Sequence, residues 1–143
     1  MRTKEKKLPI RVVAPAITRV MMDYFGFEDP DDINWGTCYY WAYIAHQFCG
    51  GKLVSLNWNA HAFIKIRNRY YDSVTNKGAK SIEDLLFFGD AGEVKIQDET
   101  EILSPESFKQ KWGYIGAYGW SDFDISKIVS GVKKNLESSN NTE

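Results

Sequence analysis

The most distinctive pattern in the chain is an apolar run without a polar face. Residues 37–48 read TCYYWAYIAHQF, with Thr37 placed to cap a helix and Gly50–Gly51 placed to end it. A helix that is apolar nearly all round needs neighbours on several sides. The pattern therefore predicts a central helix that the rest of the domain covers.

Alternation of polar and apolar residues predicts strands after this helix. Residues 52–56 (KLVSL) indicate a short strand, and residues 61–66 (HAFIKI) alternate with a period of two. The RNR that follows supplies a turn, in which Asn68 tolerates a positive φ. Residues 61–74 are therefore predicted to form a β-hairpin.

Weaker patterns predict the remaining elements. Apolar residues at helical spacing indicate a helix over residues 15–26, and Gly26 ends it. Further helices are predicted at residues 81–88 (capped by Ser81), 104–113 (with Pro105 in its first turn) and 122–136, and a further strand at residues 92–97. Together these elements indicate the α+β class, with the helix of Cys38 packed on a small antiparallel β-sheet.

The chain is interpreted as one domain with two short flanking segments. Residues 1–13 are predicted to form a basic N-terminal arm, residues 14–137 a single domain and residues 138–143 a disordered tail. No internal repeat and no linker divides the sequence. With 143 residues, 43% of them hydrophobic and 15% aromatic, the chain is large enough to bury a sizeable core.

Composition and charge exclude several classes of protein. The net charge of −1 argues against a nucleic-acid binder that works by bulk charge. No segment reaches the roughly 18 apolar residues of a membrane span. Arg11 and Pro15 interrupt the apolar stretch that a signal peptide would need. We therefore expect a cytoplasmic protein that binds neither nucleic acid nor membrane, while the oligomeric state stays open.

The two cysteines lie too far apart to pair if the central helix forms. The eleven-residue step from Cys38 to Cys49 is roughly 16 Å along a helix, whereas a disulfide needs α-carbons within about 7 Å. We therefore expect reduced thiols. Cys38 also stands at the predicted helix N-terminus, where the backbone dipoles favour an anion and hence a thiolate.

A cysteine nucleophile also needs a base and a group that orients the base. His46 lies about 12 Å along the same helix from Cys38, so it is a poor base and is interpreted as structural, as is Cys49. His61 opens a strand, from which its ring can project toward the helix terminus. Asp72 follows on the partner strand and can hold the imidazole in one tautomer.

The position of the hairpin turn decides whether His61 and Asp72 can meet. A turn at Arg67–Asn68 places the two side chains on one face as diagonal neighbours, about 7–8 Å apart. A slip of one residue moves Asp72 to the opposite face. If Asp72 instead pairs with Lys65, Asn76 is the replacement to examine. As a strand-edge carboxylate, Asp72 is expected to contribute little to packing.

The segments WGTCYYWA, HAFIKI and RYYDS together resemble the transglutaminase-like branch of the papain-like cysteine enzymes. The resemblance covers roughly residues 34–76 and implies a papain-like core. It also implies Cys38 as nucleophile, His61 as base and Asp72 as orienting group. Trp35 is an approximate match to the family's oxyanion tryptophan, and Trp35 and Asn34 are the candidate oxyanion or substrate-binding residues.

The reaction that this resemblance implies is acyl transfer through a thioester, without a metal or other cofactor. Water as acceptor gives a peptidase or amidase, which we favour, and an amine gives a transglutaminase. The expected substrate is an amide bond in a peptide, a protein or a peptidoglycan-like polymer. The backbone N–H of Cys38 is the expected first oxyanion donor.

Two other functions compete with this interpretation. The main alternative is a catalytically inactive papain-like domain that binds a peptide or a protein. A zinc site formed by the three candidate residues is a weaker alternative, because no C-x-x-C or H-x-x-x-H spacing supports it. The aromatic residues Trp35, Tyr39 and Trp58 could line a groove, or they could pack in the core or at its rim.

Overall fold

The computed structural model describes residues 7–56, 61–85 and 100–141, with side chains as far as Ser138 in the last segment. Three expectations lie wholly or partly outside these residues. They are the strand at residues 92–97, the second half of the helix at residues 81–88, and the placement of Trp58.

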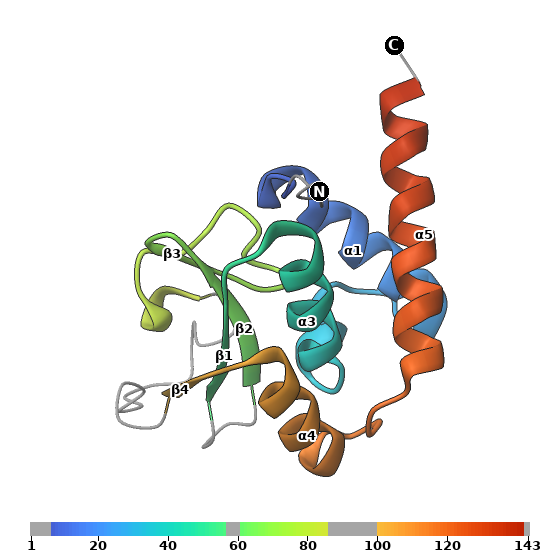
Figure 1. Ribbon diagram of the computed structural model, residues 1–143. Coiled ribbons are helices and arrows are strands. Elements are labelled where there is room, and N and C mark those ends of the chain that lie inside the picture. The colour runs from blue at the N-terminus through green and yellow to red at the C-terminus, as the bar shows by residue number, and fades with distance from the viewer. Residues whose placement is uncertain (1–6, 57–60, 86–99, 142–143) are drawn as a thin grey trace, which may run out of the picture.

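Within the described residues the protein is a mixed α/β domain with a four-stranded antiparallel sheet, ordered β3-β2-β1-β4 (Figure 1). The strands are β1 (Lys52–Leu56), β2 (His61–Ile66), β3 (Arg69–Tyr71) and β4 (Thr100–Leu103). The helices are α1 (Ile10–Phe25), α2 (Asp31–Asn34), α3 (Cys38–Cys49), α4 (Pro105–Ile115) and α5 (Asp122–Asn141), with a 3₁₀ turn, η1 (Ile82–Asp84). The α3 helix packs on β1 and β2. The α1 helix packs against both α3 and α5 (Figure 1).

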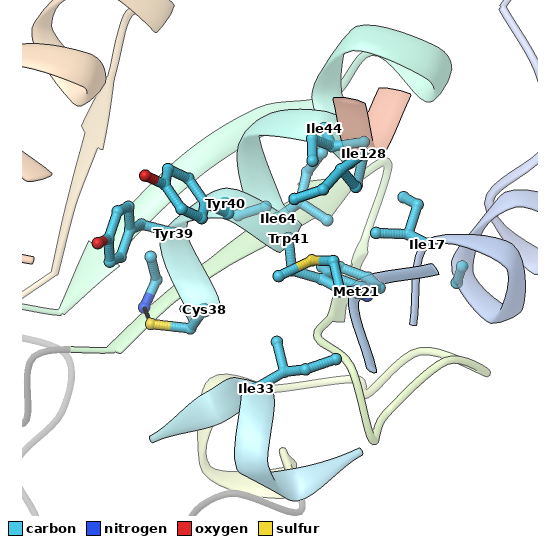
Figure 2. Close-up of a cluster of buried hydrophobic side chains, with 14 of the residues drawn as sticks. Ile17, Met21, Ile33, Cys38, Tyr39, Tyr40, Trp41, Ile44, Ile64 and Ile128 are labelled. Carbon is cyan, nitrogen blue, oxygen red and sulfur yellow. Dashed lines mark hydrogen bonds between the residues drawn. The ribbon is translucent and has the colours of Figure 1, made fainter. Parts of the chain in front are cut away.

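The prediction of a central α3 is confirmed. Its residues Cys38–Ala42, Ile44 and Ala45 are buried, and Figure 2 shows several of them among Ile17 and Met21 of α1 and Ile128 of α5. Thr37 occupies the N-cap position without a capping hydrogen bond, because its hydroxyl donates instead to the carbonyl of Ile33, at 3.3 Å. Gly50, with a φ of 79°, ends the helix as predicted.

Two tyrosines of α3 attach the segment between α4 and α5. The Tyr39 hydroxyl accepts the N–H of Tyr118 at 3.0 Å and donates to the carbonyl of Gly119 at 2.8 Å. The Tyr40 hydroxyl accepts the N–H of Ser121 at 3.0 Å. These bonds therefore hold the segment against the side chains of the first turn of α3.

The α1 helix begins five residues before the predicted start, so part of the expected basic arm is helical. Pro15 lies inside the helix and removes one of its hydrogen bonds, which made a later start the better prediction. Ile10 and Val13 nevertheless continue the buried stripe of the helix. The burial of these two side chains offsets the backbone hydrogen bond that Pro15 cannot make. Pro15 itself lies on the exposed side of the helix.

Other predictions differ at the ends of elements. The α4 helix is confirmed, with Pro105 in its first turn and the Ser104 hydroxyl accepting the N–H of Ser107. The α5 helix continues to Asn141, so most of the segment expected to be a disordered tail is helical. No glycine or proline stops the helix there, and its serines and asparagines only weaken it. The short strand β4 was not predicted. None of the helices in these residues has both the length and the apolar character to cross a bilayer.

Candidate functional site

The β2–β3 hairpin brings His61 and Asp72 together. Ile66 pairs with Arg69 and Ile64 with Tyr71, so the turn falls at Arg67–Asn68 as the favoured register requires. Arg67, rather than Asn68, takes the positive φ, at 57°. His61 Nε2 lies 3.1 Å from Asp72 Oδ2, which confirms the predicted contact.

Asp72 is more deeply embedded than a strand-edge residue was expected to be. Its side chain is 1% exposed, and Oδ1 accepts the N–H groups of Val74, at 3.1 Å, and Thr75, at 2.8 Å. These bonds bend the chain back just after β3 and fix the carboxylate toward His61. The expectation that Asp72 has little part in packing is therefore corrected.

The sulfur of Cys38 lies against the strand that carries His61. Cys38 is the first residue of α3, and its Sγ accepts the N–H of Ala62 at 3.3 Å. The β3 strand ends at Tyr71 and does not reach the level of Ala62, so this part of β2 faces the helix terminus instead. The sulfur thus lies at the start of α3 and within hydrogen-bonding distance of a backbone N–H.

The electrostatics of His61 link the other two side chains. Burial lowers the pKa of His61, but hydrogen bonds and charge interactions with Asp72 and Cys38 outweigh burial and raise the pKa to about 9. Because Asp72 takes Nε2, Nδ1 is the ring nitrogen available to the sulfur. His61 therefore lies between Asp72 and Cys38, and its raised pKa favours the protonated imidazole.

The two candidate residues before Cys38, Asn34 and Trp35, lie in different surroundings. Asn34 is buried, and its Oδ1 lies 3.1 Å from the Ser73 hydroxyl, so it ties α2 to the loop that follows Asp72. Trp35 is 71% exposed and donates its indole N–H to Asp31 Oδ2 at 3.0 Å. In this arrangement the indole N–H is directed at Asp31, while the ring stays at the surface beside the Cys38 helix.

Sequence reasoning missed the backbone donors of this site. The N–H groups of Val74 and Thr75 follow an aspartate, and aspartates commonly bond to the backbone two residues on, so that signal was present. No sequence pattern predicts the role of the Ala62 N–H. This group can bond to the sulfur because the pairing of β3 with β2 ends before it reaches Ala62. Tyr39, a candidate groove residue, is buried and stacks on Trp112 in the core.

His46 and Cys49 lie at the other end of α3. His46 Nδ1 is 3.0 Å from the carbonyl of Gly51, and burial lowers the pKa of His46. Burial raises the pKa of Cys49 to about 11, although the charge of Lys7 opposes this. Neither side chain lies near the Cys38 end of the helix, in keeping with the structural roles expected of them.

The geometry of the site is a relay in which His61 lies between its two partners. Metal ligands instead converge on one point, and within the described residues no group of three histidine, cysteine, aspartate or glutamate side chains is arranged in that way.

Treatment with a chelator is accordingly expected to leave the protein unchanged. The unfolding midpoint and the rate of thiol labelling should be the same before and after dialysis against EDTA, because the three side chains already satisfy one another. Stoichiometric zinc in the purified protein, with loss of structure on chelation, would replace the relay with a metal site.

Comparison with known proteins adds no family to this description. No protein-family model, no curated protein and no solved structure matches the chain. By its own geometry the protein is a mixed α/β domain with a buried cysteine, histidine and aspartate brought together from a helix N-terminus and a β-hairpin.

Proposed function

We propose that this protein is a thiol-dependent acyl-transfer enzyme with a papain-like, transglutaminase-like core. The observation that carries the proposal is the position of His61. It is hydrogen-bonded to Asp72 on one side and interacts on the other with Cys38 at the start of a buried helix. This arrangement supports Cys38 as nucleophile, His61 as base and Asp72 as orienting group, in the order that the reaction needs.

In the first step the Cys38 sulfur attacks the carbonyl carbon of an amide. The tetrahedral intermediate collapses when His61 donates its proton to the leaving amine, and a thioester remains on Cys38. In the second step His61 removes a proton from water, which attacks the thioester and releases the acid. An amine in place of water would give a transglutaminase, whereas hydrolysis gives the peptidase or amidase that we favour.

The oxyanion is assigned to the N-terminal end of α3. The carbonyl of Thr37 accepts the N–H groups of Tyr40 and Trp41, which begin the hydrogen-bond ladder of the helix. The N–H of Cys38 precedes that ladder and is the proposed donor, assisted by the helix dipole. Trp35 stands three residues before Cys38, and its exposed ring is proposed as a substrate contact.

The rate of alkylation by iodoacetamide tests the proposal. Cys38 should react at least about tenfold faster than Cys49 at pH 7, because burial raises the pKa of Cys49 to about 11 and keeps it a thiol. The reaction of Cys38 should remain fast at pH 6. The variant His61→Asn should lose this advantage, and His46→Asn is the matched control that should retain it.

Single-cysteine variants make this measurement clean. Residues 20–51 contain no lysine or arginine, so trypsin leaves both cysteines on one peptide. The variants Cys49→Ala and Cys38→Ala report one thiol each, by the mass of the intact protein. Equal rates for the two thiols would contradict the enzyme proposal.

One observation favours the second candidate function, an inactive domain that binds a peptide or a protein. The Cys38 side chain is nearly covered, with 3% of its surface exposed, which suits a packed residue as well as a nucleophile. Trp35 and Tyr118 lie exposed near the same helix terminus and would then form the binding surface. Slow labelling of Cys38 together with peptide binding that Trp35→Ala abolishes would select this function.

A further inference from the structure

We propose that a basic groove at the far end of α3 binds a small molecule carrying two or more phosphate groups. The groove has a volume of about 790 Å³ and lies between the start of α1, the β2–β3 turn and the loop after β3. Its cationic lining residues, which define the basic groove, are Lys7, Arg11, Arg67, Arg69 and Lys77.

The basic groove is separate from the cysteine site. Cys49, the last residue of α3, lines it, whereas Cys38 is the first residue of that helix, about 16 Å away along the axis. The start of α1 is fixed beside this end of α3 by the bond from the Leu8 N–H to the carbonyl of Phe48, at 2.9 Å (Figure 1). The inference therefore does not depend on the proposed acyl transfer.

The charge of the groove is opposite in sign to that of the whole protein. Five cationic side chains line it, and none of its described lining residues is acidic, although the full chain has a net charge of −1. In the part of the chain that the structure describes, none of the five forms an ion pair. Their mutual repulsion is unfavourable, and an anion bound between them would remove it.

Two of the five cationic side chains contact backbone carbonyls. Arg69 Nη1 donates to Gly78 at 3.3 Å, and Lys7 Nζ is 3.5 Å from the carbonyl of Gln47. Such contacts hold the side chains in place without neutralising them. The start of α1 adds positive potential, because Pro9 provides no side-chain cap and the first turn holds no acidic residue.

The chemistry of the cations and the size of the groove point to several phosphates on one small molecule. Arginine binds phosphate through two parallel hydrogen bonds, and three of the five cations are arginines. The five cations come from three segments that line one groove, and their combined positive charge exceeds the charge of about −2 that a single phosphate carries. A volume of about 790 Å³ suits a small ligand, and the apolar side chains of Ile66 and Tyr71 offer a surface for its uncharged part.

Calorimetric titration of the full chain with inorganic tripolyphosphate tests this inference. Binding is expected at low salt and should weaken as salt is added. The variant Arg11→Glu should weaken binding by about tenfold or more, because it reverses a charge in the groove. Arg19→Glu is the matched control, since Arg19 is an exposed residue two turns further along the same helix, and it should bind as the unchanged protein does.

A second variant guards against loss of folding. Arg67 has a φ of 57°, a conformation that glycine adopts without strain. Arg67→Gly should therefore keep or raise the unfolding midpoint while it weakens tripolyphosphate binding. Unchanged binding by this folded variant, or equal weakening by Arg11→Glu and Arg19→Glu, would overturn the inference.

Two further titrations distinguish the sources of phosphate. A single-stranded oligonucleotide and vesicles containing an anionic phospholipid should each bind more weakly than tripolyphosphate at equal salt. Tighter binding of either one would show that the groove serves a nucleic acid or a membrane surface, and the small-molecule inference would then be wrong. Labelling of Cys38 in Arg11→Glu should stay as fast as in the unchanged protein, which separates this result from the outcome at the cysteine site.

Discussion

Replacement of Asp72 by asparagine is expected to slow the acylation of Cys38 by about two to four orders of magnitude. The carboxylate accepts a hydrogen bond from His61 Nε2, and the hydrogen bond and charge of Asp72 raise the pKa of His61. Asparagine keeps the shape but removes the charge that stabilises the imidazolium. The burst of p-nitrophenolate released from p-nitrophenyl acetate measures the acylation rate directly.

Asparagine is more informative than alanine at this position. The amide oxygen of Asp72→Asn can still accept the N–H groups of Val74 and Thr75, so the bend after β3 is retained. Asp72→Ala removes the acceptor for all three donors in a buried site, which costs about 1–3 kcal/mol for each donor left unsatisfied. Its lost activity would therefore combine an effect on chemistry with partial unfolding.

A matched control and a contrary outcome define the test. Asp84→Asn changes an exposed aspartate in η1 and should leave both the burst and the unfolding midpoint as they are. If folded Asp72→Asn gives the burst rate of the unchanged protein, Asp72 does not orient the base and only holds the loop after β3.

The parts of the site that the sequence predicted are those that local patterns determine. The apolar run of α3 gives a buried helix, and the glycines after it end the helix, so Cys38 is placed at its start. The two-residue turn and the alternation along β2 fix the hairpin register, and with it the side of the sheet on which Asp72 lies. Hydrophobic periodicity and the length of the turn were therefore sufficient to predict the positions of Cys38, His61 and Asp72.

The parts that could not be predicted depend on segments far apart in the chain. The β4 strand is short and largely exposed, and its pairing with β1, in which Leu53 faces Leu103, makes it a strand. The link from Asn34 to Ser73 joins two loops without a periodic pattern. The early start of α1 similarly depends on tertiary burial of Ile10 and Val13, which outweighs the local signal of Pro15.

The free energy of unfolding is expected to fall as the pH rises from 6.5 to 9. The pKa of His61 is raised from 6.5 to about 9 in the folded protein. Its contribution to stability is therefore fully present below pH 6.5 and is lost as the pH rises through 9. A shift of this size corresponds to about 3 kcal/mol, because each unit of pKa is about 1.4 kcal/mol. Urea unfolding followed by tryptophan fluorescence at several pH values measures the change.

Two other groups with shifted pKa values, His46 and Cys49, affect the free energy of unfolding mainly below pH 6.5 and above pH 9. The pKa of His46 is lowered by burial, so His46 costs stability only as the pH falls below 6.5. The pKa of Cys49 is raised to about 11, so Cys49 costs stability as the pH rises past its ordinary value of 9.0, and the variant Cys49→Ala removes that effect. In this background Asp72→Asn should flatten the fall between pH 6.5 and 9, because the hydrogen bond to Asp72 is the largest influence that raises the pKa of His61. A stability that stays level or increases up to pH 9 would show that His61 is folded as the neutral imidazole, and an imidazolium at rest could then play no part in the first step.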